Sequence, residues 1–339
     1  MLLDPAQARS LYEYAAQERF AILAVNADSP SAILDCLQAA QLSDAPLIIE
    51  TSLWQLTGRS FGDGDPILGM TRYLTDLAVL ANSPRFRPIP IIYHTDHIKG
   101  LDTERILTAA IEGLPIAFPG IEASLTASSI SLDSSELSPE DNVRLMCRLC
   151  EVAEATSSLA TLEMEAGVDC GVTPIEETEN VFGAVEDRHP GHLALWAPGV
   201  GTHHGLAAGN HVDPEAIHAH QKKASEICER PIGLALHGSS GLSNDALKEA
   251  VAAGTVKVNW SSESLLIRSQ AARRFYATRG DQLEKSHPDF KKTAMDNGIQ
   301  SYVSTPYIER VQERIETLSG NGKAGRFMAT LEQASPKTL

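Results

Sequence analysis

Short runs of apolar and β-branched residues recur along the whole chain, and longer segments with helical character separate them. Continuous apolar runs of this length are typical of strands that are buried on both faces, as in a parallel sheet. The pattern predicts strands at Ala21–Asn26, Pro46–Glu50, Ile89–Tyr93, Ser129–Leu132, Ala160–Met164, His192–Trp196, Ile232–Leu236 and Val256–Asn259.

The segments between these runs carry residues that begin and end helices. Ser138–Asp141 supplies a cap residue, a proline for the first turn and acidic side chains ahead of an apolar stretch. Asp213 and Pro214 do the same for a second helix, and Ser243 begins a third that Gly254 ends. Strands that alternate with helices predict a closed (β/α)8 TIM barrel, with a doubly wound open sheet as the alternative. No GxGxxG follows the first strand, which disfavours the dinucleotide-binding open sheet.

We therefore expect a single α/β domain over residues 1–339. The barrel is expected over about residues 20–280, with an N-terminal helix before it and C-terminal helices over about 281–330. One long connection, Gly167–Arg188, is acidic and lacks periodicity. It is either a solvated surface loop or, as we favour, a mobile lid, because the active sites of barrels are built from such loops.

Composition and charge narrow the class of protein. A hydrophobic fraction of 43% and a charged fraction of 21% are typical of a globular protein. The formal net charge of −16 repels phosphate backbones, so we expect no nucleic-acid partner. No apolar run is long enough to cross a bilayer, so no membrane partner is expected either.

The cysteines favour a reducing, cytoplasmic location. Their number, 5, is odd, and their spacing suggests no disulfide framework. Cys147 and Cys150 form a CxxC, but they lie in the helical stretch Asn142–Ala155 among apolar residues. We interpret them as packing residues of a helix rather than as a redox or metal pair.

Polar residues follow most of the predicted strands at the point where each strand ends. In a (β/α)8 barrel these ends meet at one mouth, so their side chains are expected to converge. Three segments bring histidines to this mouth and others bring carboxylates. The residues are Asn26, Thr51, Ser52, His94, Asp96, His97, Asp133, Glu165, His203, His204, His237 and Asn259.

Three of the histidines stand out because each borders a turn of small residues. They are His97, His204 and His237. A single histidine near a strand end is more often an ordinary packing or surface residue than a metal ligand. Three imidazoles with an open fourth position, however, are typical of a catalytic zinc site, whereas closed structural sites usually rely on cysteine. Co2+, Mn2+ or Fe2+ are alternative occupants of the same donor set.

Six blocks in this order resemble the class II fructose-bisphosphate aldolase family. They read IIYHTDHIKGL, SISLDSSELSPEDNV, TLEMEAG, GTHHGL, LALHGSSGL and TVKVNWSSES. The similarity runs from about Ala21 to near Arg310. The resemblance implies a metal-dependent aldolase that reversibly cleaves a ketose phosphate through a zinc-stabilised enediolate. It further implies a donor like dihydroxyacetone phosphate, an aldehyde acceptor, and a homodimer or higher homo-oligomer.

The resemblance also assigns metal ligands. His97, His204 and His237 match the residues that bind the catalytic zinc. Glu165 matches a carboxylate that can bind metal when no substrate is present, and Asp133 matches an acid at a second, accessory metal position. A monovalent cation is a further expected cofactor.

The acid and base follow from the same blocks. Asp96, the aspartate of HTDH, matches the family's acid/base for the acceptor carbonyl. A second base exchanges a C1 proton of the donor, and in the family it is an acidic residue of the loop after the fifth strand. Glu176, Glu177 and Glu179 are the candidates for this role.

The residues that the resemblance implies in substrate binding belong to several turns. Arg310 matches an arginine that reaches the distal phosphate, with a solvated arginine on the C-terminal helix as the alternative. Glycine turns and hydroxyls are expected to hold the donor phosphate. The full set is Asn26, Ser52, Gly205, Gly238, Ser240, Asn259, Ser262 and Arg310.

The chain departs from the family pattern where substrate is handled. The lysine that commonly follows HG is absent, because Gly205 is followed by Leu206. Loss of one lysine–phosphate contact costs about 1–3 kcal/mol. An unusual sugar phosphate from specialised biosynthesis is therefore an alternative substrate. A zinc-dependent hydrolase on the same barrel is a second alternative, but it usually needs an HxH in the first strand, which AILAVN lacks.

Overall fold

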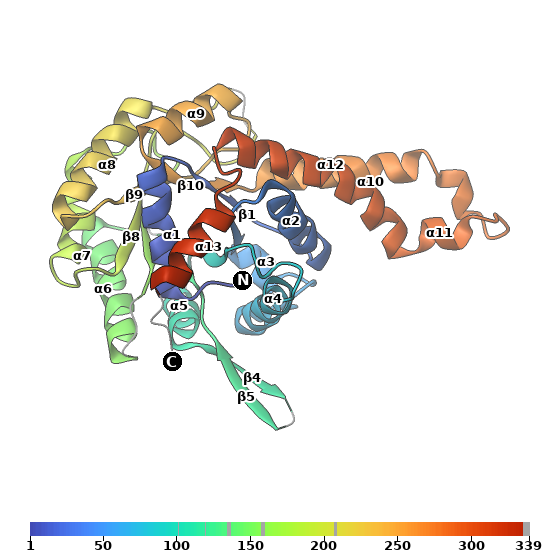
Figure 1. Cartoon of the computed structure of the whole chain (residues 1–339), viewed down its shortest axis with the longest axis horizontal. Helices are drawn as coiled ribbons and strands as arrows, with labels where there is room; N and C mark the ends of the chain where they lie inside the picture. The colour runs from blue at the N-terminus through green and yellow to red at the C-terminus, as the bar shows by residue number, and fades with distance from the viewer. Residues whose placement is uncertain (101, 119, 134–136, 157–159, 207–208, 335–339) are drawn as a thin grey trace.

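The computed structural model describes residues 1–100, 102–118, 120–133, 137–156, 160–206 and 209–334. Eight parallel strands close into a barrel in the order β1-β10-β9-β8-β7-β6-β3-β2. The prediction of a (β/α)8 barrel is therefore confirmed (Figure 1). The strands are β1 (Ile22–Val25), β2 (Leu47–Thr51), β3 (Ile91–Ile98), β6 (Ser129–Leu132), β7 (Leu162–Ala166), β8 (Leu193–Pro198), β9 (Gly233–Leu236) and β10 (Thr255–Trp260).

Helices surround the barrel, and several begin at the residues that the sequence predicts. The side chains of Ser138, Asp213 and Ser243 each accept a hydrogen bond from a backbone N–H in the first turn of the helix that follows. The helices of the ring are α2 (Pro30–Ser43), α3 (Leu53–Thr57), α4 (Pro66–Ala81), α5 (Thr103–Glu112), α6 (Pro139–Ala155), α7 (Ala184–Glu186), α8 (Pro214–Cys228) and α9 (Asn244–Ala253).

The N-terminal helix, α1 (Pro5–Glu18), closes one end of the barrel. Its apolar face packs against the inward-facing residues Ile22, Ile48 and Ile92 near the start of their strands. The last helix, α13 (Ala324–Ala334), lies beside α1 (Figure 1). Water is thereby excluded from this end, and the opposite end remains as the mouth.

A buried charged layer lies between this apolar plug and the mouth. It contains Glu50, His94, Glu163 and Lys257, each with 0% of its surface exposed. Each of them lies two positions before a polar residue of the mouth, and side chains two apart on a strand point to the same side. The interior of the barrel is therefore apolar below, ionic in the middle and polar at the mouth.

The sequence-based strand assignment differs from the structure most clearly at the third strand and at a hairpin that it missed. The third predicted strand, Ile89–Tyr93, is displaced in the structure, where β3 runs to Ile98 and contains the whole HTDH block. A hairpin of β4 (Leu114–Phe118) and β5 (Ile121–Leu125) was not predicted, and it projects from the barrel without pairing with it (Figure 1).

The acidic stretch Gly167–Arg188 is partly helical. A π-helical segment, η1 (Thr178–Gly183), packs against α8 and α6 and buries Val181 and Phe182. Because these side chains belong to the packed wall of the barrel, the alternative of a solvated surface loop was wrong for residues 178–186, and the favoured mobile lid stays a prediction.

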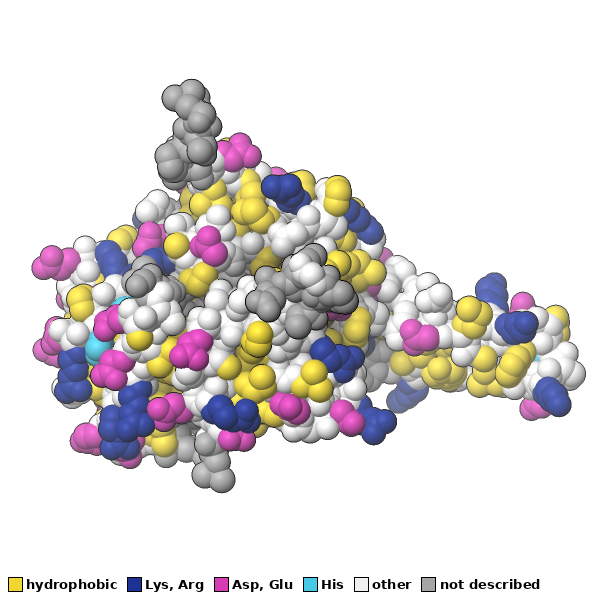
Figure 2. Space-filling view, turned by 90° about the horizontal axis from the view of Figure 1, so that it is seen from below, with side chains coloured by type: hydrophobic (Ala, Val, Ile, Leu, Met, Phe, Trp, Pro, Cys, Tyr) yellow, Lys and Arg dark blue, Asp and Glu magenta, His cyan; other side chains and the backbone are white. Residues whose placement is uncertain are grey.

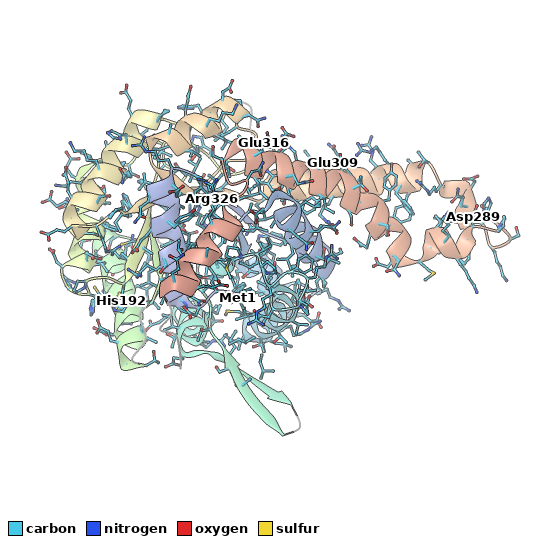
Figure 3. All side chains as sticks on the ribbon, viewed as in Figure 1. Met1, His192, Asp289, Glu309, Glu316 and Arg326 are labelled. Carbon is cyan, nitrogen blue, oxygen red and sulfur yellow. The ribbon has the colours of Figure 1, made fainter. Side chains whose placement is uncertain are left out.

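A helical arm extends from the barrel. It consists of α10 (Ser262–Ala277), a short 3-10 turn η2 (Gly280–Leu283), α11 (Phe290–Ala294) and α12 (Asp296–Thr317). Asp289 lies near its far end (Figure 3). Hydrophobic side chains gather along the arm (Figure 2), and the exposed ones include Tyr276, Leu283, Phe290 and Met295. Within the described part of the chain, no helix has the length and apolar character to span a membrane.

Candidate active site

The mouth of the barrel holds a cavity of about 620 Å3. Most of the predicted site residues line it, although they come from strands and turns far apart in the sequence. Those that do so are Asn26, Ser52, Asp96, His97, Asp133, His204, Gly205, Gly238, Ser240, Asn259 and Ser262.

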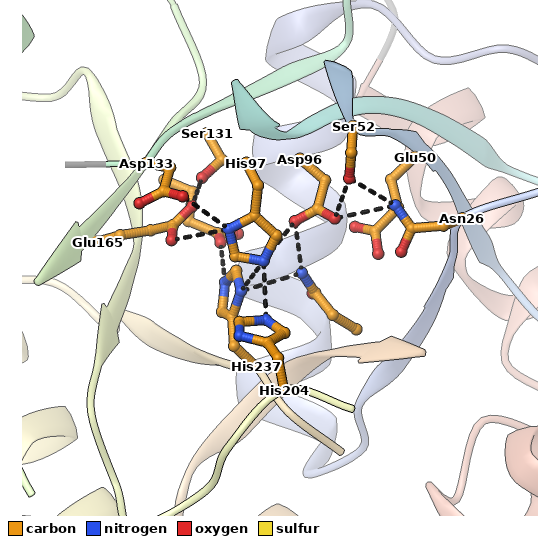
Figure 4. Close-up of polar contacts among 12 residues, drawn as sticks. Asn26, Glu50, Ser52, Asp96, His97, Ser131, Asp133, Glu165, His204 and His237 are labelled. Carbon is orange, nitrogen blue, oxygen red and sulfur yellow. Dashed lines mark hydrogen bonds and ion pairs between the residues drawn. The ribbon is translucent and has the colours of Figure 1, made fainter. Parts of the chain in front are cut away.

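Three imidazoles converge on one point beside this cavity (Figure 4). The Nε2 atom of His97 lies 2.9 Å from Nε2 of His204 and 3.1 Å from Nδ1 of His237. Nitrogen ligands that are each about 2.0–2.1 Å from one zinc ion lie about 3 Å apart. The three nitrogens therefore have the spacing of ligands that share a divalent cation.

Two of these rings are held from behind by a carboxylate. Nδ1 of His204 lies 2.6 Å from Oδ2 of Asp169. Nε2 of His237 lies 2.7 Å from Oε1 of Glu163. A carboxylate behind a histidine fixes which ring nitrogen carries the proton, so that the other presents its lone pair. This arrangement is typical of metal-binding histidines.

The third ring lies between Asp133 and Glu165. Its Nδ1 is 3.4 Å from a carboxylate oxygen of each of these residues. Both were predicted as metal ligands, and the structure places them on the edge of His97 that faces away from the other two histidines. They form with His97 a second group that could hold a cation. In this geometry they orient His97 rather than share its Nε2.

A distortion of β3 brings both Asp96 and His97 to the mouth. Neighbouring side chains on a regular strand point to opposite faces. The register between β3 and β6 shifts between Thr95 and Ile98, and His97 has a φ of 49° in the left-handed region. A bulge of this kind redirects a side chain, but it strains the backbone, and backbone strain is common at functional sites.

The local charges suit a cation. Burial, together with the neighbouring His97 and Lys257, lowers the pKa of His237 well below its ordinary value, so this ring is neutral as a ligand must be. Burial also opposes charge on His97, but Asp96 and Glu165 outweigh it and raise its pKa. The same negative groups would favour a divalent cation beside Nε2 of His97.

Asp96 is held at both of its carboxylate oxygens. Nδ2 of Asn26 donates to Oδ2 at 2.9 Å, and Oγ of Ser52 donates to the same oxygen at 3.1 Å. Nδ2 of Asn259 donates to Oδ1 at 2.9 Å. Burial opposes the charge of Asp96, but His97 and other nearby positive groups prevail, and its pKa falls to about 2. Asp96 is therefore a carboxylate at neutral pH.

Backbone N–H groups are available on the other side of the cavity. The first turn of α10 begins at Ser262, and Ser261 and Ser262 both line the cavity. Gly238 has a φ of 66°, and a Cβ there would lie 2.7 Å from the carbonyl oxygen of His203. Glycine therefore lets two turns approach each other closely, and together with a helix N-terminus they offer donors to an anion.

Six predicted residues lie outside the lining of this cavity. His237 and Glu165 lie beside it and contact His97, and the others are Glu176, Glu177, Glu179 and Arg310. Glu177 lines a separate cavity of about 200 Å3, and Glu176 is exposed beside it in the chain. Arg310 is held by carboxylates, with Nη2 2.7 Å from Oε1 of Glu263 and Nη1 2.5 Å from Oε2 of Glu313. Arg310 is therefore a partly buried arginine paired with two carboxylates, and its predicted contact with a distal phosphate stays a prediction.

Sequence reasoning overlooked four residues of the site. Glu163 and Lys257 lie two positions before Glu165 and Asn259, so the period of a strand could have placed them inside the barrel. Trp54 lies in α3, the short helix that follows β2. Asp169 lies in the acidic stretch, where no periodicity distinguishes it from its neighbours.

Asp169 gives a first testable prediction. Asp169→Asn keeps an oxygen that can accept from the backbone N–H of His204, a contact of 2.7 Å, but removes the charge behind the ring. We expect metal affinity to fall about 10–100-fold, the usual effect of losing such a partner. Titration against a chelator measures it, with His204→Ala as the control that loses the metal. Wild-type affinity in Asp169→Asn would show that the carboxylate does not support the ligand.

The comparisons with known proteins agree with this geometry. A family model described as fructose-bisphosphate aldolase class-II matches residues 6–323. Over 301 residues, 80% of this chain and 81% of the relative, the sequence is 26% identical to fructose-bisphosphate aldolase 1 of Paracoccidioides lutzii. Over 283 residues, 75% of this chain and 76% of the relative, it is 27% identical to fructose-bisphosphate aldolase of Saccharomyces cerevisiae.

Two solved structures share the fold. The fructose-bisphosphate aldolase from Campylobacter jejuni superposes with a TM-score of 0.79 at 22% identity, covering 95% of this chain and 97% of that chain. The YdjI aldolase from Escherichia coli K12 superposes with a TM-score of 0.70 at 20% identity, covering 96% of this chain and 100% of that chain.

Proposed function

The chain belongs to the class II fructose-bisphosphate aldolase family, and from this premise we propose that it uses zinc at the mouth of its barrel. As a member of that family it is an aldolase, an aldehyde-lyase that acts on a sugar phosphate. The proposed donor product is dihydroxyacetone phosphate or a close relative. One observation carries the proposal: three imidazoles share a centre next to the buried carboxylate of Asp96.

His97, His204 and His237 are the proposed ligands of the cation. Three nitrogen donors with an open side towards a cavity suit a catalytic zinc ion, and the same set accepts Co2+, Mn2+ or Fe2+. A bound cation supplies Lewis-acid stabilisation of the negative charge that carbon–carbon cleavage leaves on the donor. Asp133 remains a proposed ligand of an accessory metal position, and Glu165 remains a proposed metal ligand in the absence of substrate; both lie at the other edge of His97.

Asp96 is the proposed acid/base. In cleavage its carboxylate takes the proton from the hydroxyl whose carbon becomes the aldehyde, while the electrons of the broken bond stay with the donor. In condensation the same proton returns to the aldehyde oxygen. Asn26, Ser52 and Asn259 hold the carboxylate in position for both directions.

The donor phosphate is proposed to bind at the N-terminus of α10 and at the turns after β8 and β9. The favourable end of the helix dipole and backbone N–H groups lie there, as anion sites require. A monovalent cation beside this phosphate is part of the proposal. The proposed contacts are Gly205, Gly238, Ser240 and Ser262.

The base for the donor C1 proton is not supplied by the described arrangement of the acidic stretch. Glu176, Glu177 and Glu179 stay predictions, and each would need its part of the acidic stretch to move towards the cavity. Asp169 does line the cavity, but both of its oxygens already contact His204.

Exchange of donor protons tests the proposed function. We expect the zinc-loaded protein to replace a C1 proton of dihydroxyacetone phosphate by deuterium in D2O, because the charge left by deprotonation is stabilised at the site. Proton NMR follows the loss of signal. Chelator-treated protein and His204→Ala should both be inactive. If the zinc-loaded wild type shows no exchange, the proposed donor is wrong.

We also propose that the protein is a homodimer or higher homo-oligomer of the cytoplasm. The apolar residues exposed on the helical arm support self-association, because large exposed apolar surfaces commonly mark interfaces. The cysteines, which are free in the described structure, are compatible with a reducing compartment.

A further inference from the structure

The helix α3 forms a wall of the cavity next to Asp96. The residue that precedes it, Ser52, donates to Oδ2 of Asp96 at 3.1 Å. Leu53, Trp54 and Thr57 of this short helix line the cavity. A substrate whose carbonyl oxygen reaches Asp96 would therefore extend along α3.

This wall lies apart from the turns after β8 and β9 in the proposed phosphate site, whereas the N-terminus of α10, which follows β10, has only β1 between it and β2. In the barrel order, β1 and β10 separate β2, which leads into α3, from β9 on one side. On the other side β3, β6 and β7 separate β2 from β8. A donor held by the turns after β8 and β9 thus leaves the α3 wall to the acceptor.

We propose that Trp54 is a specificity-determining residue for the acceptor, and that the acceptor is an unphosphorylated hydroxyaldehyde whose C–H face packs on the indole. The inference rests on the proposed function and specifies the substrate class of the same site. Its first support is the exposure of Trp54, whose surface is 47% accessible within the lining of the cavity. The other two tryptophans, Trp196 and Trp260, are fully buried.

An accessible indole in a concave site points to a ligand. Apolar and aromatic side chains dominate the lining of small-molecule sites, with a few polar groups that fix orientation. An indole ring presents a large flat face at a low cost in conformational entropy, and its π-electrons favour contact with C–H groups that carry partial positive charge. Leu53 and Thr57, both half-buried, extend the same wall.

The charges of the cavity argue against a second phosphate on the acceptor. Among the described residues that line it, Lys99 is the only lysine or arginine, against the carboxylates of Asp96, Asp133 and Asp169. The Nζ atom of Lys99 lies 3.5 Å from Asp133. A divalent cation would offset the remaining negative charge, and a donor phosphate would make the site negative again. A phosphorylated acceptor would add further repulsion.

Arg310 does not supply the missing positive charge in this arrangement. Its guanidinium contacts Glu263 and Glu313 and lies outside the lining of the cavity. The ion pairs with these two carboxylates would have to break before a phosphate could take their place. The distal end of the acceptor therefore meets an indole rather than a guanidinium.

Tryptophan fluorescence tests the inference without measuring activity. Because Trp196 and Trp260 are buried, quenching by acrylamide should come mainly from Trp54 in the full-length, zinc-loaded protein. Saturating D-erythrose should protect this emission, and Trp54→Phe should abolish the quenchable fraction. If acrylamide quenches the free protein only weakly, for example because another subunit covers the indole, the inference is wrong. The inference is also wrong if D-erythrose gives no protection.

Acceptor kinetics provide the second test. D-erythrose and D-erythrose 4-phosphate form a matched pair that differs only in the phosphate, and we expect at least a roughly tenfold higher kcat/KM for D-erythrose. Trp54→Ala should raise the KM for D-erythrose about tenfold, the scale of a lost apolar contact in a pocket, and Trp54→Phe should restore most of it. A preference for the phosphorylated acceptor, or an unchanged KM in Trp54→Ala, overturns the inference. Absence of donor exchange in the wild type would instead defeat the proposed function.

Discussion

Asp96→Asn is expected to lower kcat for cleavage about 10²–10⁴-fold, the range that a positioned acid or base contributes. The substitution keeps the volume of the side chain and removes its ability to take a proton. Asp96→Ala should lose activity at least as severely, because it also leaves Asn26, Ser52 and Asn259 without their buried acceptor. Steady-state rates for both variants measure the effect.

The metal content of these variants decides between two roles for Asp96. Its Oδ1 atom lies 3.5 Å from Nε2 of His97, the nitrogen that faces the proposed cation. If Asp96 moves protons, both variants should retain stoichiometric zinc and should still exchange the C1 proton of the donor, which a different base removes. Loss of zinc would make Asp96 a ligand, and loss of exchange with zinc retained would make it the C1 base.

The barrel and most of its mouth could be predicted because they follow from short patterns. Apolar runs identify the strands, and in a parallel barrel the position of a residue at a strand end places it at the mouth. His204 and His237 could be identified in this way, since His237 directly follows β9 and His204 lies in the connection after β8, each next to small residues. The convergence of their ring nitrogens is a consequence of topology.

What the sequence did not reveal depends on long-range packing. The bulge that turns His97 towards the mouth arises from a register shift between β3 and β6, which no local pattern specifies. Asp169 is placed by the backbone of the turn after β7, and its role depends on His204, which is 35 residues away. The pairing of Arg310 with Glu263 brings together two helices of the arm, whose packing the periodicity of either helix alone does not determine.

The buried charged layer is predicted to be the most sensitive part of the barrel to substitution. Nζ of Lys257 lies 2.9 Å from Oε2 of Glu163 and 3.4 Å from Oε2 of Glu50, and all three side chains have no exposed surface. Burial opposes the charge of Lys257, but the two glutamates outweigh it and raise its pKa. Lys257→Met should destabilise the fold by about 3–5 kcal/mol, because breaking a buried pair leaves charge without a partner.

Urea unfolding measures this loss, and two further variants show its origin. The double variant Lys257→Met/Glu163→Gln should recover part of the stability, because it also removes the charge of Glu163, which Lys257→Met alone leaves without its partner. Lys248→Met is the matched control, because Lys248 is exposed on α9 and contacts only Asp245 among the described ion pairs. Its substitution should have a much smaller effect. Equal unfolding midpoints for Lys257→Met and the wild type would mean that the layer does not hold the barrel together.

Lys257 also connects the buried charged layer to Asp96, the proposed acid/base. Nζ of Lys257 donates to Oδ1 of Asn259 at 2.6 Å, which leaves Nδ2 of that amide to donate to Asp96. Lys257 is one of the positive groups that hold the pKa of Asp96 down at about 2. In Lys257→Met this pKa should therefore rise, and the acid limb of the kcat/KM profile should move to higher pH. If Lys257→Met lowers the stability of the fold but leaves the acid limb of the kcat/KM profile in place, Lys257 has a structural role only. A residue that positions Asp96 must also alter the pKa of Asp96.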